Sequence, residues 1–171
     1  MTREGALLVM IVLAVVLLAI GIAAWRRRTR RDAGIAAPVG EVPVGAVERA
    51  HVSALYVATT PHDEPLERLA IRGMGFRSRA DVTVTDRGVA LDLTGQPRLF
   101  LAVGHIVEVD LATVAIDRVV EPSGLVRLTW RVGDRFVDSY LRPQDGSARA
   151  LADTVAATLP ASTTTPTGTD A

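Results

Sequence analysis

The sequence of 171 residues contains no cysteine, no lysine and no asparagine. The absence of cysteine excludes disulfides, thiolate metal ligands, cysteine nucleophiles and lipid attachment through a cysteine. All 19 basic residues are arginine. Lysine and asparagine both have A-rich codons, so we attribute their absence to a GC-rich genome rather than to a need for arginine chemistry.

The charges balance over the whole chain but are unevenly distributed. Six arginines lie within the first 31 residues, and the remainder of the chain carries 13 arginines and 18 acidic residues, a net charge of −5. Nucleic-acid binding depends on clustered positive charge, which releases counterions from the phosphates. We therefore expect no nucleic-acid partner.

A long apolar run near the N-terminus predicts a membrane-spanning helix. Residues 5–25 (GALLVMIVLAVVLLAIGIAAW) carry no charge. As a helix they would span ~31 Å, which matches the ~30 Å hydrocarbon core of a bilayer. A core helix of a soluble domain would show a polar stripe, and this run has none. The alternative is a cleavable signal peptide, which needs a basic n-region and a shorter apolar run.

A cluster of arginines directly after this run predicts the orientation of the helix. Its members are Arg26, Arg27, Arg28, Arg30 and Arg31. The other flank carries only Arg3, Glu4 and the terminal amine. The positive-inside rule therefore places the N-terminus outside and the rest of the chain on the cytoplasmic side of the cell (inner) membrane.

Composition divides the chain into four parts. Residues 1–31 are the anchor with its basic cluster. Residues 32–51 are rich in Ala, Gly, Pro and Val without a regular period, and predict a linker that holds the domain about 25 Å off the membrane on a random-coil estimate. Residues 52–160 form one domain, and the low-complexity residues 161–171 predict a disordered tail.

Alternating apolar and polar residues predict a β-rich domain with about seven antiparallel strands. Strands are expected over 53–60, in a hairpin over 82–93, near 98–103, in a broken stretch over 106–120, and over 126–132 and 136–141. Residues 121–124, before the strand over 126–132, and residues 133–135, after it, are predicted to be turns. Trp130 is expected on the buried face of its strand.

The apolar period changes to that of an amphipathic helix over residues 145–159. The residues at helical spacing are Ala148, Leu151, Ala152, Val155 and Leu159. Asp145 or Ser147 can cap the start, and Pro160 ends the helix. We expect this C-terminal helix to close one end of a split barrel or sandwich.

Seven strands followed by a closing helix resemble the pleckstrin-homology (PH) superfold. Residues 124–143 (GLVRLTWRVGDRFVDSYLRP) and the helix after them are similar to the end of bacterial PH-like domains in single-pass actinobacterial membrane proteins. The resemblance covers residues 52–160 and the anchor, and it rests mainly on core and turn positions. It brings no catalytic residue to this chain.

No motif in the sequence predicts catalysis, a cofactor or a metal site. The histidines at 51, 62 and 105 have no second ligand at helical spacing, so a metal is not expected. His62-Asp63-Glu64 reads as a solvated loop. Gly73-Met74-Gly75 reads as a turn, because it lacks the lysine of a phosphate loop. A Gly-x-Ser-x-Gly elbow is also absent, and we expect the protein not to be an enzyme.

One group of arginines is a candidate binding site. Arg68, Arg72, Arg77 and Arg79 lie between the first two expected strands. In phosphoinositide-binding PH domains, basic residues in this loop grip phosphates, and Arg77-Ser78-Arg79 resembles their basic-x-basic pair. Arginine also suits bidentate phosphate contacts. Because acidic residues share the loop, we favour solvation as their role and keep a lipid-headgroup site at Arg72, Arg77 and Arg79 as the alternative.

Three functional hypotheses follow. The first is a membrane-tethered binding or scaffold module that holds an unidentified cytoplasmic protein, received at an exposed sheet edge or in the groove beside the helix. The second is a sensor of anionic lipid headgroups. The third is an accessory subunit of an export or transport system with partners in the bilayer, although the uncharged span over 5–25 argues against a role in translocation.

The orientation can be tested with reporters fused after Ala171. We expect only a cytoplasmic reporter to be active, because five arginines directly follow the apolar run. Replacing these five arginines with neutral residues should give mixed orientation. An active alkaline-phosphatase fusion on the unchanged chain would reverse the predicted topology.

Overall fold

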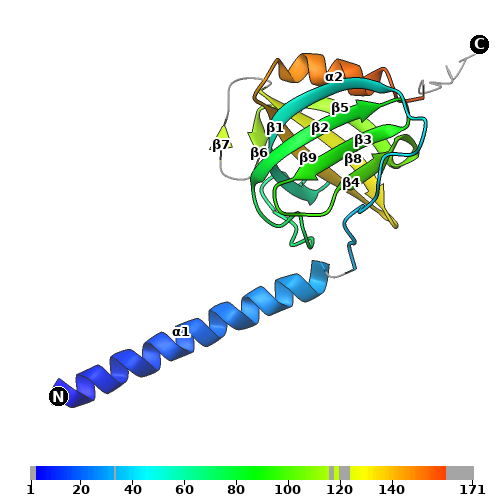
Figure 1. Ribbon diagram of the computed structural model, residues 1–171. Helices are drawn as coiled ribbons and strands as arrows, with labels where there is room; N and C mark the ends of the chain where they lie inside the picture. Colours follow the sequence, from blue (N-terminus) through cyan, green and yellow to red (C-terminus); the bar gives the residue numbers. More distant parts are fainter. Residues whose placement is uncertain (1–2, 33, 116–117, 120–123, 161–171) are drawn as a thin grey trace, which may run out of the picture.

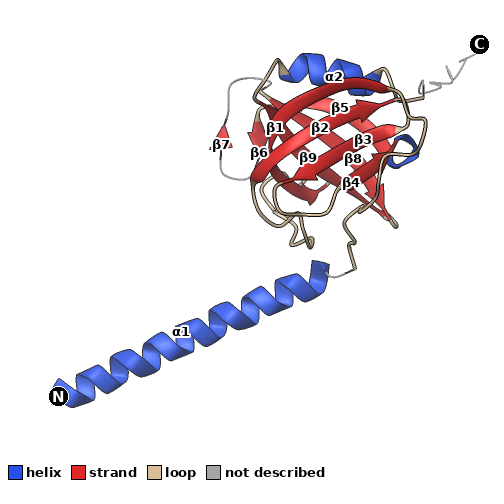
Figure 2. Ribbon diagram, viewed as in Figure 1, coloured by secondary structure: helices blue, strands red, loops and turns tan. Residues whose placement is uncertain are grey.

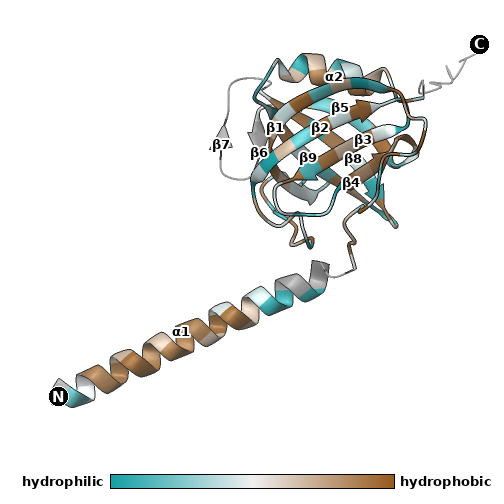
Figure 3. Cartoon of the chain, viewed as in Figure 1, coloured by the Kyte–Doolittle hydropathy of each residue, from teal (hydrophilic) through white to brown (hydrophobic). Residues whose placement is uncertain are grey.

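The computed structural model describes residues 3–32, 34–115, 118–119 and 124–160, and consists of one long helix followed by a β domain (Figure 1). The expected tail at 161–171 and most of the expected turn at 121–124 lie outside the described residues. Helix α1 covers Arg3–Asp32. Apolar residues occupy all sides of α1 along most of its length (Figure 3).

Within α1, the segment Leu7–Arg27 is long and apolar enough to cross a membrane, and none of it is buried against the domain. A signal sequence near an N-terminus meets the same criterion. The helix continues through the arginine cluster to Asp32. The expected apolar helix is therefore confirmed, whereas its orientation stays a prediction.

Seven strands form one antiparallel sheet in the order β4-β3-β2-β1-β9-β8-β5. Their bounds are β1 Glu48–Pro61, β2 Ser78–Thr85, β3 Gly88–Leu93, β4 Leu99–Ala102, β5 Ile106–Ala112, β8 Leu125–Val132 and β9 Arg135–Pro143. A short 3₁₀ helix, η1 (Val103–His105), joins β4 to β5. Strands β6 (Val114–Ala115) and β7 (Arg118–Val119) pair separately. The expected seven-stranded antiparallel fold is confirmed, in its sandwich-like rather than barrel form, because β4 and β5 do not pair with each other.

The longest strand, β1, belongs to both halves of the sheet. Its first part, Glu48 to Tyr56, pairs with β2, and its last part, Ala54 to Pro61, pairs with β9. The register with β9 shifts between Tyr56 and Ala58. Such a bulge bends a strand and increases its twist, so β1 can turn from one half of the sandwich into the other.

The hairpin of β2 and β3 was predicted from alternation and is confirmed, with Val82 opposite Leu91 and Thr85 opposite Gly88. Gly88 has a φ of +152°, and a Cβ atom added there would lie 2.2 Å from the carbonyl oxygen of Leu101 on β4. Only glycine therefore permits β4 to pair this closely with the start of β3.

Residues 35–41 lie against the edge of the sheet, although composition predicted a linker there. We call residues 35–41 the strap. Ile35 is buried in the core, Val39 bridges Leu99, and the Phe100 N–H donates to the Pro38 carbonyl at 2.8 Å. The strap thus extends the sheet beyond β4. Periodicity could not reveal this, because one buried side chain and a pair of backbone hydrogen bonds leave no repeating pattern.

Arg98 ties the strap to β3. Its guanidinium donates to both carboxylate oxygens of Asp92 at 2.7 and 3.0 Å, and to Glu41 of the strap at 3.2 Å. These contacts raise the pKa of Arg98, chiefly through the hydrogen bonds to Asp92. A bidentate pair of this kind has a fixed geometry, and it positions the side chain that holds the strap.

Helix α2 (Ala148–Ala156) closes one end of the sandwich, as expected (Figure 2). Of the two capping residues considered, Ser147 is the cap, and its hydroxyl accepts from the Ala150 N–H at 3.1 Å. The helix packs on β1, β5, β8 and β9. The buried side chains on its inner face are Ala148, Leu151, Ala152 and Val155.

A chain of polar contacts crosses the core beside Trp130. The indole N–H donates to the Ser139 hydroxyl at 2.9 Å, and that hydroxyl lies 2.7 Å from the Thr59 hydroxyl. Tyr56 continues the chain, with its hydroxyl 2.8 Å from Thr59 and donating to the Met74 carbonyl at 2.8 Å. Trp130 is 2% exposed, which confirms its expected place on the inner face.

The structure predicts that Trp130→Ala destabilises the domain by ~3–5 kcal/mol, because it opens a cavity and leaves Ser139 without its donor. Denaturant unfolding of residues 35–160, followed by circular dichroism, measures this. Trp130→Phe keeps most of the volume and should cost about 1–2 kcal/mol through the lost hydrogen bond alone. An alanine variant as stable as the parent would contradict the burial of this side chain.

Candidate functional site

The loop between β1 and β2, residues 62–77, carries the arginines that the sequence singled out. We call it the first loop. Arg72 and Arg77 in the loop and Arg79 on β2 are all exposed. Among the described residues, none of these three has an ion-pair or hydrogen-bond partner for its guanidinium. Three unpartnered cations thus lie along one short segment.

Arg68 has a different role from its three neighbours. Its guanidinium donates to the carbonyl of Val57 on β1 at 2.6 Å and to the carbonyl of Gly75 at 3.0 Å. Arg68 therefore fixes the middle of the loop to β1 and to the second half of the loop. The sequence grouped all four arginines together, and only the structure separates the one that supports the loop.

The first loop is packed against the sheet rather than extended into solvent. Leu69, Ile71 and Met74 are buried, and the Leu69 N–H donates to the Thr59 carbonyl at 2.8 Å. Gly73, with a φ of +83°, forms the expected turn, in which the Met74 N–H donates to the Ile71 carbonyl. Phe76, by contrast, is 76% exposed.

A second polar group lies on the outer face of β8 and β9, around Asp138. This carboxylate is buried, and its Oδ1 accepts from the Thr129 hydroxyl at 2.7 Å. Nδ1 of His62 lies 3.0 Å from the same oxygen. The hydrogen bond to Asp138 raises the pKa of His62, against the opposing effect of desolvation.

The sequence predicted that His62 belongs to a solvated loop, and it did not identify Asp138. The two residues are 76 positions apart, so no local spacing could connect them. An aspartate in a strand is most often solvated, so the residue type gave no signal of a buried carboxylate either. His62 and Asp138 resemble two members of a catalytic triad, but no serine, cysteine or free hydroxyl is placed beside His62 by the contacts of the described residues.

The other histidines have no common site. The His51 ring nitrogen lies 3.1 Å from the Thr83 hydroxyl, and His105 ends η1. In the part of the chain that the structure describes, no group of three or more acidic, histidine or cysteine residues could hold a metal ion.

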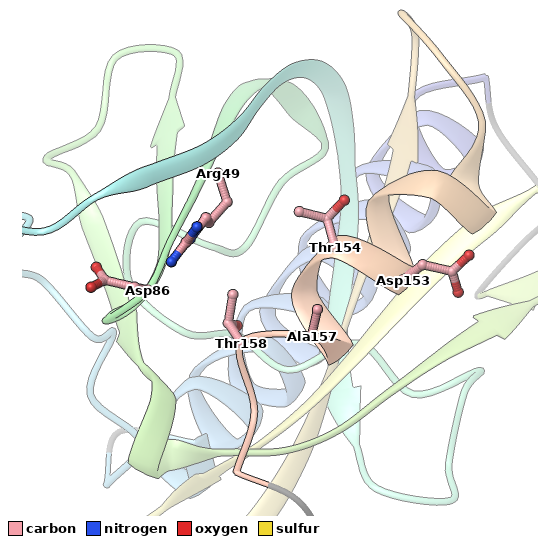
Figure 4. A pocket seen from close by; sticks show the side chains of 6 residues that line it. All are labelled: Arg49, Asp86, Asp153, Thr154, Ala157 and Thr158. Carbon is pink, nitrogen blue, oxygen red and sulfur yellow. The ribbon is translucent and has the colours of Figure 1, made fainter.

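A shallow pocket of about 720 Å³ lies between the start of β1, the β2–β3 turn and the end of α2 (Figure 4). The Arg49 side chain points into it, whereas Asp153 points away. The hydroxyls of Thr154 and Thr158 donate to carbonyls of their own helix, and Asp86 accepts from the Val47 N–H at 2.8 Å. Most polar groups of the lining are thus already satisfied, and Arg49 is the main group that could contact a ligand.

The two edges of the sheet differ. The β4 edge is occupied by the strap, whereas β5 pairs only with β8 among the described residues. Helix α2 packs against β5. On β5, Val107 is 53% exposed, and Glu108 and Asp110 each lie within ion-pair distance of Arg127.

Comparison with known families gives a match. The model of the family described as Bacterial PH domain-like matches residues 35–157. The chain belongs to this family. The match begins at Ile35, the first buried residue of the strap, which agrees with the packing of the strap on the domain. A comparison with curated proteins found no match to the chain.

Membership of a PH-like family indicates that the β domain is a binding module. PH-like domains are in general binding modules for lipids or proteins rather than enzymes. The family match does not identify a partner, and the arginines at 72, 77 and 79 have no role assigned by it. The exposed groups described above are therefore the starting points for a functional proposal.

The pair of His62 and Asp138 predicts a pH dependence of stability. Because the pKa of His62 is raised in the folded protein, its contribution is fully present below the unfolded-state pKa of about 6.5 and is lost as the pH rises through the folded-state value. We expect His62→Gln to cost about 1 kcal/mol more at pH 5.5 than at pH 8, after allowance for solvent screening of this partly exposed pair.

Thermal unfolding of the parent and the variant at both pH values measures this difference. His51→Gln is the control for the loss of an imidazole, because its ring contacts a hydroxyl rather than a carboxylate. An equal loss at pH 5.5 and pH 8 for His62→Gln would show that the pair carries no charge-dependent stability.

Proposed function

We propose that this chain is a membrane-tethered binding module that holds a cytoplasmic protein at the inner membrane by accepting an extended segment at the β5 edge. The observation that carries the proposal is the difference between the two sheet edges. An unpaired strand presents a row of backbone donors and acceptors, which a partner strand can satisfy. The strap covers the β4 edge at Leu99 and Phe100, whereas the β5 edge, beside α2, has no strand paired to it among the described residues.

The charges on β5 favour a basic partner over a second copy of the chain. Two copies of β5 paired antiparallel about Val109 would place Glu108 of one copy opposite Asp110 of the other. Like charges directly opposite each other destabilise a strand pair. An extended segment with arginine or lysine at alternate positions would instead meet carboxylates, which Arg127 compensates only in part.

The anchor supports the other half of the proposal. Helix α1 has the length and composition of a membrane span, and the arginine cluster after it favours a cytoplasmic domain. A binding domain on a membrane anchor acts by holding its partner protein at one location in the cell. Here that place is the surface of the membrane.

Site-specific photocrosslinking in native membranes tests this function. A photoreactive residue at Val107 should give a discrete protein adduct, whereas one at Val44, which is fully exposed in the turn after the strap, should not. Replacing Glu108 and Asp110 together with arginine should reduce the Val107 adduct several-fold if the partner is basic. Equal adducts at the two positions, or none at Val107, would contradict binding at the β5 edge.

A further inference from the structure

The outer face of β5, β8 and β9 carries three carboxylates around one guanidinium. Arg127 on β8 lies directly opposite Asp110 on β5 and Tyr140 on β9 in the register of the strands. Glu108 and Asp138 lie diagonally from Arg127 on the same face, and diagonal neighbours are within reach of a long side chain. Arg127 donates to Asp110 at 2.7 Å, and its Nη2 lies 3.7 Å from Glu108. One cation is therefore shared among more carboxylates than it can neutralise.

The guanidinium of Arg127 has one donor that this arrangement does not use. Its Nε atom is buried and has no hydrogen-bond partner among the described residues. A buried N–H without an acceptor costs free energy, so a second position of the side chain that satisfies Nε would recover that cost. The pKa of Arg127 is lowered by desolvation but raised overall, by the hydrogen bond to Asp110 and by the charge of Asp138. Asp138 is thus the acceptor toward which Arg127 can turn.

His62 competes with Arg127 for the charge of Asp138. This carboxylate is 1% exposed, and its Oδ1 lies 3.0 Å from Nδ1 of His62. The other groups that face the imidazole are Asp63 of the first loop, 3.7 Å from Nε2, and the ring of Phe136 on β9. The charge of Arg127 on β8 opposes protonation of the ring. A protonated His62 neutralises Asp138, whereas a neutral His62 leaves that charge to Arg127.

We propose that His62 is a proton gate for the β5 edge. A proton on its imidazole keeps Arg127 on the two carboxylates of β5, and loss of the proton turns Arg127 toward Asp138. This inference rests on the proposed function, in which the β5 carboxylates receive a basic extended segment. With His62 charged, Arg127 compensates these carboxylates and the edge binds such a segment weakly. With His62 neutral, the carboxylates lose their cation and binding is stronger.

The direction of the pH dependence follows from the charge of His62. Its pKa is raised in the folded protein, chiefly by the hydrogen bond to Asp138, so the gate changes state above the ordinary value of about 6.5. At pH 5.5 the ring is protonated, and at pH 8.5 it is mainly neutral. A side chain with two positions follows the difference in interaction free energy between them, which here is set by one charge on a buried carboxylate.

The photocrosslink at Val107 measures the gate in the full chain. Native membranes are opened by freezing and thawing, so that buffer reaches both faces, and the adduct is formed at pH 5.5 and at pH 8.5. The otherwise unchanged chain should give several-fold more adduct at pH 8.5. His62→Gln, which cannot carry a charge, should give the high yield at both pH values. Asp138→Asn, which removes the charge that draws Arg127, should give the low yield at both.

His105→Gln is the matched control, because His105 ends η1 directly before β5 and is the histidine nearest to Val107 in the sequence. Its adduct should keep the pH dependence of the unchanged chain. Circular dichroism of each full-length variant in neutral detergent verifies the fold at both pH values. A mere loss of stability would lower the adduct in both His62→Gln and Asp138→Asn, whereas the gate predicts opposite effects.

A second measurement follows Arg127 without any partner. The full chain is prepared with isotope-labelled arginine in neutral detergent micelles, and the Nε–H signal of Arg127 is assigned by its absence in Arg127→Lys. This signal should shift with the titration of His62 in a nuclear magnetic resonance spectrum. The shift should vanish in His62→Gln and in Asp138→Asn.

An equal yield at Val107 at both pH values, or a pH dependence that is lost only in His105→Gln, would overturn the gate while binding at the β5 edge stands. An Arg127 signal that does not respond to His62 would also overturn it, whatever the crosslinks show. If no adduct forms at Val107 at either pH, the docking of a partner at β5 is wrong, and the gate is overturned with it.

Discussion

The pairing of β1 on both sides is the constraint on which the rest of the fold depends. One continuous strand carries β2 along its first part and β9 along its last part. The other strands of the seven-stranded sheet are linked to β1 through these two partners: β3 and β4 through β2, and β8 and β5 through β9. The bulge between Tyr56 and Ala58 lets the strand bend between the two halves, and Tyr56 and Thr59, on either side of the bulge, begin the polar chain that reaches Trp130. The bend and the core polar contacts therefore meet at Tyr56 and Thr59.

The parts of the fold that could be predicted from the sequence are those with a regular period. Val82, Val84, Val89 and Leu91 alternate with polar residues, and they form the hairpin that the pattern indicated. The spacing of Leu151 and Val155 likewise indicated the helix that covers the sheet. Trp130 could be assigned to the core because its strand alternates without interruption.

The contacts between distant or irregular segments could not be predicted. The strap has no period, and its single buried residue, Ile35, looks like any other apolar residue in a sequence rich in Ala, Gly and Pro. His62 and Asp138 meet only because β1 and β9 are neighbours in the sheet. The net charge of the domain also does not reveal which arginines are neutralised by partners, as Arg98 and Arg127 are.

The strap also determines how a mechanical load reaches the domain. It joins the sheet at the edge of β4, held by the buried Ile35 side chain, a few backbone contacts and the ion pair of Glu41 and Arg98. A pull along the chain from α1 meets these contacts one after another, so they open in sequence and share little of the force. The strap would detach before the interior strands separated, and the free segment would then lengthen the connection to α1 while the core stayed folded.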